Sequence, residues 1–215
     1  MKIQRTRQFA TWIDALKDVT ARARILARIG RLAEGHPGDH RYLGDGISEL
    51  RIDAEPGYRV YYTQRGRQLV ILLVGGDKAH SNAISKRPGR LHVPCERRTG
   101  CSRNESIPKY WSCSIMATKK KVELKAFDVA EHLRTPEEMA AYLDACIEES
   151  DGDSAFIAKA LGDIARAQGM SKVARAAGLS RESLYRALSG ERSPDFATIL
   201  KVTRALGVRL HASAV

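Results

Sequence analysis

Residues 47–63, ISELRIDAEPGYRVYYT, decide the fold of the first part of this chain. Apolar and polar side chains alternate in the runs at both ends, as in half-buried β-strands, and Pro56-Gly57 supplies a turn between them. The alternation predicts a hairpin with Leu50 and Ile52 facing a core and their neighbours facing the opposite side. The side chains expected together on that opposite, open side are Arg51, Arg59 and Tyr61.

The residues around this hairpin complete a small domain over residues 1–78. A short strand is expected at residues 2–5, a helix around Trp12 and a second helix that Thr20 can cap and Gly35 can end. Residues 68–74, QLVILLV, predict a third strand after the hairpin. The order predicts an α+β fold in which two helices cover one face of an antiparallel sheet.

The second of these helices carries a row of basic side chains on one face. Arg24, Arg28 and Arg31 follow each other at helical spacing. Such a row can contact RNA, but a charge run of this kind is more often a solvated helix face, and we adopt that interpretation.

The open side of the sheet is a candidate site. Arg51, Arg59 and Tyr61 can line this surface together, and Lys78, after the turn at residues 75–77, can close its edge. The alternative is that these are ordinary solvated side chains on an exposed sheet.

The ordered set 49–52, 56–62 and 75–78 resembles the RelE/ParE toxin superfamily, and most closely its HigB-like addiction module killer branch. The resemblance covers residues 1–78 and implies cleavage of mRNA in the ribosomal A site by basic residues, without a metal or another cofactor. Attack by the 2′-hydroxyl of the RNA needs a proton shuttle and cations opposite the developing phosphorane charge, which residues of this kind can supply. It implies phosphate contacts for Arg51 and Arg59 and an edge position for Lys78, whereas Tyr61 is our addition from strand geometry. A gyrase inhibitor of the ParE type shares the fold, so the target stays open.

Residues 122–215 read as all-helical. Residues 127–133 look helical, Thr135-Pro136-Glu137-Glu138 forms a capping box, and a further helix is expected from about Ser154 to Gln168. Ser193-Pro194 starts a last helix that Gly207 ends. The expected organisation is a helical segment at residues 122–165 followed by a second helical domain at residues 166–215.

Residues 171–188, SKVARAAGLSRESLYRAL, have the spacing of a helix-turn-helix. Ala174 is small where the helices cross, Gly178 supplies a left-handed turn residue and Ser180 caps the second helix. The side chains then left to reach base edges and phosphates in a major groove are Ser171, Ser180, Arg181, Glu182, Ser183, Tyr185 and Arg186. A helical hairpin without a role in DNA binding is the alternative.

This order of helices resembles the HigA-like antitoxins, helix-turn-helix addiction module antidote proteins related to phage repressors. The resemblance implies that residues 122–165 bind and silence the toxin and that residues 166–215 are the DNA-binding domain. It also implies that this part, as a homodimer, represses its own operon. A dimer would read two half-sites about 34 Å apart in operator DNA.

Charge is distributed in blocks along the chain. Residues 1–78 carry 14 basic and 9 acidic groups, residues 79–115 carry 7 and 2, residues 116–163 carry 6 and 11, and residues 164–215 carry 9 and 3. The basic blocks at the two ends suggest anionic partners. The acidic block between them can pair with basic groups of the same chain, and this attraction would also steer association of the two halves.

The joint between the halves, residues 79–121, follows neither pattern and is interpreted as an irregular basic linker. The toxin's usual last helix is missing, and suitable codons for residues 79–88, read one base out of phase, spell that helix. We therefore hypothesise a frameshift after Lys78 that runs the toxin into an antitoxin starting at Met116. Free thiols are expected for Cys95, Cys101, Cys113 and Cys146, with zinc as the alternative because His92 is nearby.

The combined expectation is a fused type II toxin–antitoxin protein of the cytoplasm, with no membrane span, metal or cofactor. The antitoxin half would neutralise the toxin half and repress transcription, and the toxin half would be inactive or silenced. The alternative is an active ribosome-dependent endoribonuclease with an attached regulatory domain, and a third possibility is an inert fusion.

Overall fold

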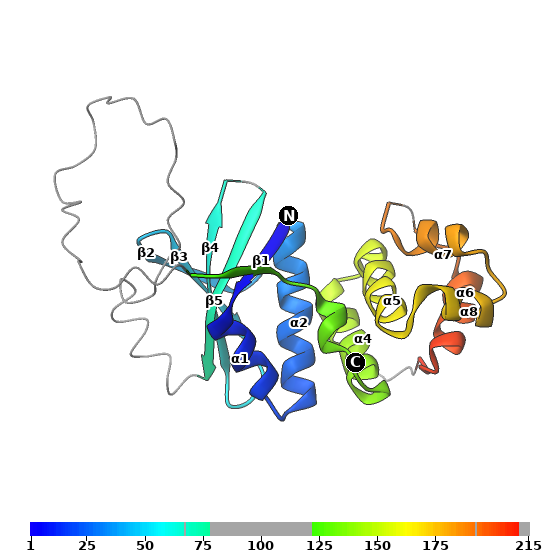
Figure 1. The fold of residues 1–215 in the computed structure, drawn as a ribbon, viewed down its shortest axis with the longest axis horizontal. Helices are drawn as coiled ribbons and strands as arrows, with labels where there is room; N and C mark the ends of the chain where they lie inside the picture. The colour runs from blue at the N-terminus through cyan, green and yellow to red at the C-terminus, as the bar shows by residue number, and fades with distance from the viewer. Residues whose placement is uncertain (67, 78–121, 192, 211–215) are drawn as a thin grey trace.

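The computed structural model describes residues 1–66, 68–77, 122–191 and 193–210 (Figure 1). The first part contains β1 (Lys2–Thr6), α1 (Arg7–Ala15), α2 (Val19–Glu34), β2 (His40–Gly44), β3 (Ile47–Ile52), β4 (Tyr58–Arg65) and β5 (Leu69–Asp77). The second contains β6 (Leu124–Ala126), the 3-10 helix η2 (Val129–His132), α4 (Pro136–Ser150), α5 (Ser154–Gln168), α6 (Met170–Ala176), α7 (Arg181–Leu188) and α8 (Phe196–Leu206). The predicted α+β class, a sheet with two helices followed by a helical region, is confirmed.

The sheet contains the predicted hairpin and two strands that were not predicted. Its order is β2-β3-β4-β5-β1-β6, and β3 pairs with β4 so that Leu50 lies opposite Val60 and Arg51 opposite Arg59. Neighbours from β2 to β5 are antiparallel, whereas β1 runs parallel to β5 and antiparallel to β6. The sheet is therefore mostly antiparallel, and its outermost described strand on the β1 side comes from the second half of the chain.

Helices α1 and α2 cover one face of the sheet. Their apolar side chains and those of the strands form one core, which includes Phe9, Ile25, Leu50 and Val60. The cap of α2 differs from the prediction, because the carboxylate of Asp18, and not Thr20, accepts a hydrogen bond from a first-turn N–H, that of Ala21, at 3.0 Å. Gly35 ends the helix as predicted.

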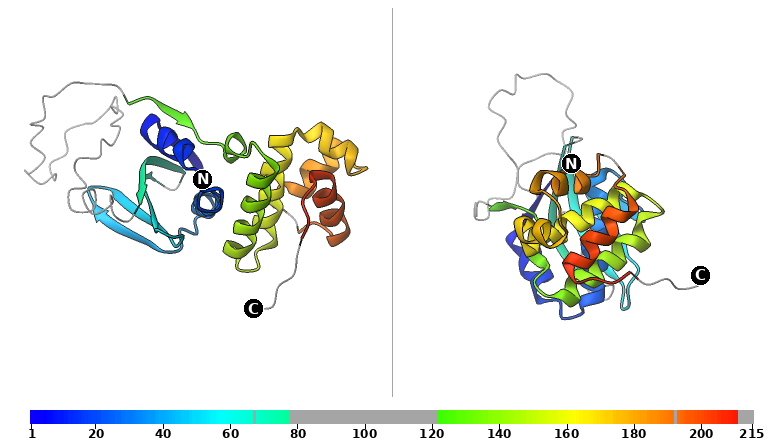
Figure 2. Two further views of the ribbon diagram at one scale, coloured as in Figure 1. Left: turned by 90° about the horizontal axis from the view of Figure 1, so that it is seen from below. Right: turned by 90° about the vertical axis from the view of Figure 1, so that its right-hand side faces the viewer.

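A second core joins the two halves of the chain. It contains buried side chains of α4 to α8 together with Ala23, Leu26 and Ala27 on the outer face of α2. Helix α2 therefore lies between the sheet on one side and α4 on the other (Figure 2). The two halves of the chain, which were expected to be separate domains, therefore share this second core.

The helices of the second half begin and end near their predicted residues. The capping box at Thr135 and Glu138 starts α4, and α5 spans the predicted residues. Between α6 and α7, Gly178 has a φ of 67° and Ser180 caps α7, accepting from the N–H of Ser183 at 3.0 Å. The predicted helix at residues 127–133 is reduced to η2, since Phe127 continues the path of β6, its N–H donating to Ile3.

The last helix, α8, starts at Phe196, after the predicted Ser193-Pro194, and ends at Gly207 as predicted. In the described parts of the chain, no helix has the length and apolar character that crossing a membrane requires.

Candidate functional site

Strand β6 extends the sheet of the first half by pairing with its edge strand β1. Gln4 lies opposite Ala126 and Arg5 opposite Lys125, and the N–H of Phe127 donates to the carbonyl of Ile3 at 3.0 Å. Leu124 packs against the small apolar cluster that contains Ile71 and Leu73 on the sheet face away from the helices. The second half thus occupies a strand edge that would otherwise present unpaired backbone groups.

Helix α4 packs along the outer face of α2. That face presents the small residues Ala23 and Ala27, which allow two helices to approach closely. Opposite them, the side chains of Tyr142 and Cys146 are buried, with 1% and 0% of their surface exposed. Burial raises the pKa of the Cys146 thiol well above its ordinary value, so this cysteine is a packing residue and not a reactive thiolate.

Acidic groups at the end of α4 and the start of α5 meet the arginine row of α2. The pairs are Arg24 with Glu148 at 3.1 Å, Arg28 with Glu149 at 2.9 Å and Arg31 with Asp153 at 3.0 Å. We call these three pairs the charge ladder. The interpretation of the arginine row as a solvated face is wrong, because a sequence pattern shows that a face is charged but not which element packs against it.

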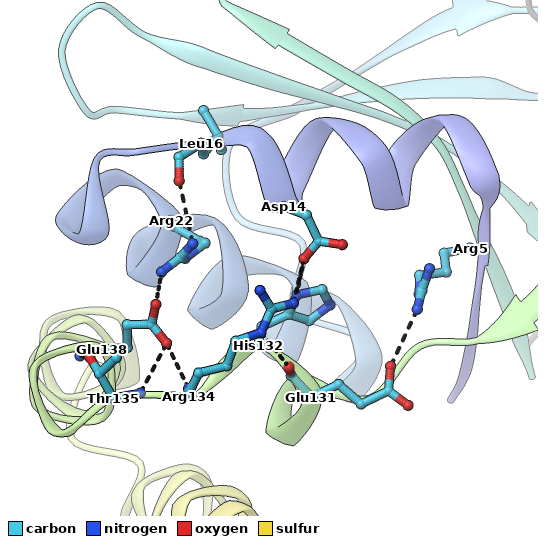
Figure 3. Close-up of polar contacts among 9 residues, drawn as sticks. All are labelled: Arg5, Asp14, Leu16, Arg22, Glu131, His132, Arg134, Thr135 and Glu138. Atoms are coloured by element: carbon cyan, nitrogen blue, oxygen red, sulfur yellow. Dashed lines mark hydrogen bonds and ion pairs between the residues drawn. The ribbon is translucent and has the colours of Figure 1, made fainter.

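A more buried ion pair lies at the other end of α4 (Figure 3). Arg22 of α2 contacts the carboxylate of Glu138, and the two side chains are only 11% and 12% exposed. Arg22 also donates to the carbonyl of Leu16 at 3.3 Å. Glu138 accepts from the backbone N–H of Arg134 at 2.6 Å and of Thr135 at 3.2 Å, so a residue of the capping box of α4 also anchors the helix to the first half.

A third polar group connects α1 and β1 with η2 (Figure 3). Asp14 of α1 lies 3.3 Å from Nδ1 of His132 and 2.9 Å from the guanidinium of Arg134, and Arg5 pairs with Glu131 at 3.2 Å. His132 is 3% exposed, and its burial lowers the pKa of the imidazole below the ordinary 6.5, although the nearby Asp14 acts in the opposite direction. The neutral imidazole is therefore the form that fits this contact.

The predicted catalytic side chains do not form a fully open surface. Arg51 and Arg59 are 33% and 18% exposed, and each guanidinium Nε lies within 3.2 Å of Oε1 of Glu49, itself only 5% exposed. Tyr61 shares this face, but it is fully buried, so its expected exposure is corrected. Alternation along β4 predicts on which face of the sheet Tyr61 lies. Its burial depends on the neighbouring strands, where Glu49 and Val74 lie opposite it.

Glu49 was missed as a site residue, although its position two residues before Arg51 places both on one face. Its carboxylate compensates two like charges that stand directly opposite each other across β3 and β4. A hollow of about 850 Å³ opens beside Arg51 and Arg59. Lys78 lies outside the described residues, as do Cys95, Cys101, Cys113 and the predicted linker.

The candidate DNA-binding side chains lie at the surface of α6 and α7. All seven are exposed: Ser171, Ser180, Arg181, Glu182, Ser183, Tyr185 and Arg186. The Ser180 hydroxyl is engaged as the cap of α7, and the guanidinium of Arg181 lies 5.5 Å from the ring centroid of Tyr185. Lys172 and Arg175 add exposed cations on α6 that the sequence analysis did not select.

A cleft of about 670 Å³ separates part of β1 and α2 from α5 and α7. Asp163 lies in it, accepting from the Tyr142 hydroxyl at 3.0 Å and from Arg166 at 2.5 Å, and burial raises the pKa of its carboxyl. The described ranges contain no cluster of His, Cys, Asp and Glu that could hold a metal ion.

Comparison with known proteins separates the chain into the same two halves. Residues 11–89 match the family described as "Phage derived protein Gp49-like", past the predicted boundary at residue 78, and residues 123–214 match the family described as "Probable addiction module antidote protein". A Haemophilus influenzae protein named only as uncharacterized is 53% identical over 89 residues, which is 41% of this chain and 90% of that protein. Another from the same organism is 49% identical over 79 residues, 37% of this chain and 80% of that protein. No solved structure matches the chain.

Proposed function

We propose that this chain, which belongs to the toxin–antitoxin proteins and joins a Gp49-like toxin half to an addiction module antidote half, is a self-neutralised transcriptional repressor. The antidote half neutralises the toxin half and binds operator DNA, in the manner of HigA-like antitoxins. The toxin half is a RelE-like or HigB-like fold that is silent in the intact chain.

The observation that carries this proposal is the way the second half docks on the first. Strand β6 occupies the edge of β1, α4 covers α2, and the charge ladder pairs cations of one half with carboxylates of the other. Arg28 and Arg31 are only 12% and 14% exposed in these pairs. A surface of this kind supports a partner relationship between the halves, because buried charges need a matching partner.

Repression is supported by the surface of α6 and α7. The exposed Arg181, Tyr185 and Arg186 on α7 have the chemistry that reads base edges and phosphates. Helix α8 carries exposed apolar side chains, Phe196 at 67% and Leu200 at 47%, which fit a homodimer through the antidote half. Two copies would present two recognition helices to an operator with two half-sites.

Operator binding is tested with the full chain and the DNA upstream of its own gene in an electrophoretic mobility shift assay. We expect a specific shift that weakens steeply with salt and is lost on Arg181→Ala or Arg186→Ala. Arg41→Ala, an equal change of charge on the exposed edge strand β2, is the matched control and should keep binding. No preference for this DNA over an unrelated duplex would refute the repressor assignment.

RNA cleavage by the toxin half is a second candidate, favoured by the two guanidiniums that converge beside the hollow at Arg51 and Arg59. Expression of residues 1–115 alone should then arrest growth, and Arg59→Ala should relieve the arrest. Growth arrest that persists in the Arg59→Ala variant would exclude this site as the source of the activity. Expression of the intact chain should cause no growth arrest.

A further inference from the structure

Gly30 occupies a helix position that gives glycine no local advantage. It lies within α2, and its backbone is not left-handed, so no turn requires it there. Glycine in a helix interior is less favourable than alanine because it loses more backbone entropy on folding. The reason for a glycine must therefore lie in what packs against α2.

The ring of Phe156, from α5 of the antidote half, takes the space that a side chain at residue 30 would need. A Cβ atom placed on Gly30 would lie 3.2 Å from Cε2 and 3.5 Å from Cζ of this ring. Phe156 is 3% exposed, and together with Gly30 it lines one side of the cleft of about 670 Å³. An alanine would already press on the ring, and a larger side chain would displace it.

Charged groups hold the ring in this place. The guanidinium of Arg31 lies 5.1 Å from the centroid of the Phe156 ring, within the range of a cation–π contact. The same guanidinium lies 3.0 Å from the carboxylate of Asp153, which caps α5 by accepting from the N–H groups of Ala155 and Phe156. The end of α2 therefore binds the start of α5 through one aromatic ring and one ion pair.

We infer that Gly30 and Phe156 are a matched pair of specificity-determining residues, through which this toxin half accepts its own antidote half. The inference rests on the proposed function, in which the second half neutralises the first. A slide of the antidote half along α2, on which it packs chiefly through α4, by one helical turn of about 5.4 Å would move the ring from Gly30 toward Ala27 or Glu34, where a side chain stands. The pair thus sets the register of docking, and a toxin half with a larger residue at this position rejects an antidote with phenylalanine.

The test uses the full chain with a protease site placed within residues 79–121, cut after purification, and measures the dissociation constant of the two halves. We expect Gly30→Leu to weaken binding at least about tenfold and Phe156→Ala also to weaken it. The combination Gly30→Leu/Phe156→Ala should bind about tenfold more tightly than the two separate effects predict, because the leucine fills the space of the lost ring. Gly30→Leu/Ile157→Ala, which removes a neighbouring apolar side chain of α5, is the matched control and should show no such recovery.

Additive effects of the two substitutions would overturn the inference. If the parent halves separate on cutting, the proposed neutralisation fails instead, and urea unfolding of the uncut variants still shows whether the two positions are coupled. Circular dichroism of the uncut chains checks folding. If the Gly30→Leu variant does not fold, the same double-mutant comparison is made with Gly30→Ala and Phe156→Leu. Coupled effects of these two substitutions support the proposed pair, and additive effects refute it.

Discussion

The ion pair between Arg22 and Glu138 should contribute more to stability than any pair of the charge ladder. Replacement of Arg22 by methionine keeps most of the aliphatic length and removes the guanidinium. Glu138 then remains 12% exposed without its cation, although backbone N–H groups of Arg134 and Thr135 still solvate it. Breaking one side of a buried pair typically costs about 3–5 kcal/mol, and these remaining hydrogen bonds place the expected loss near the lower end, about 3 kcal/mol.

The assay is thermal unfolding of the full chain followed by circular dichroism. A loss of about 3 kcal/mol corresponds to a fall in melting temperature of roughly 6–12 °C for a chain of this size. Glu138→Gln, which keeps the capping geometry, should cost less, and the double variant should lose little beyond Arg22→Met alone. Arg24→Met is the matched control, since the Arg24 and Glu148 side chains are 35% and 63% exposed and such pairs contribute below about 1 kcal/mol. Equal losses for Arg22→Met and Arg24→Met would refute the reasoning.

Three further predictions concern two contacts between the halves and one contact inside the first half. Phe127→Ala should destabilise the intact chain by about 2 kcal/mol in urea unfolding, because its ring packs on Phe9 and stacks on His132; an unchanged midpoint would contradict this. The stability that His132 contributes is present above pH 6.5 and should fall as the pH drops below that value, since the unfolded chain binds the proton more tightly; His132→Gln should flatten this dependence in unfolding curves, and an unaltered slope would exclude His132 as its source. Gly75→Ala should cost about 1–3 kcal/mol, because the added Cβ would overlap the Trp12 ring; a melting temperature equal to that of the parent chain would show that the ring moves freely.

Local patterns in the sequence predict the elements whose side chains decide their own structure. The alternation in residues 47–63 gives the β3–β4 hairpin, and the capping box at Thr135 gives the start of α4. The α6–α7 turn follows from Gly178 and Ser180, because only local backbone and capping requirements act there. In each case the residues that form the alternating pattern, the capping box or the turn lie close together in the sequence.

The features that escaped prediction depend on residues far apart in the sequence. Strand β6 is three residues long and exists because β1 offers an edge, so no periodicity marks it. The arginine row of α2 is charged in the sequence, but its partners lie more than a hundred residues away on α4 and α5. Tyr61 lies on the predicted face of the sheet but is buried, because its exposure depends on side chains of β3 and β5 and not on β4 alone.

The candidate sites divide in the same way. The exposed positions on α6 and α7 follow from a helix-turn-helix spacing and agree with the structure in their exposure. On the sheet, Arg51 and Arg59 were placed together correctly, but the role of Glu49 between them required the cross-strand register. A pattern of charges on one strand does not show which charge of the neighbouring strand it meets.

The measurement that tests the central claim most directly is whether the two halves stay together once the chain between them is cut. The full chain, cleaved at a protease site within residues 79–121, is applied to gel filtration at about 1 µM, a concentration at which only a complex with a binding free energy beyond roughly −8 kcal/mol remains intact. We predict one peak containing both halves, which separates when Arg24, Arg28 and Arg31 are all changed to glutamate. Two separate peaks from the parent chain would contradict the account, because the antidote half could then not hold the toxin half by its own contacts.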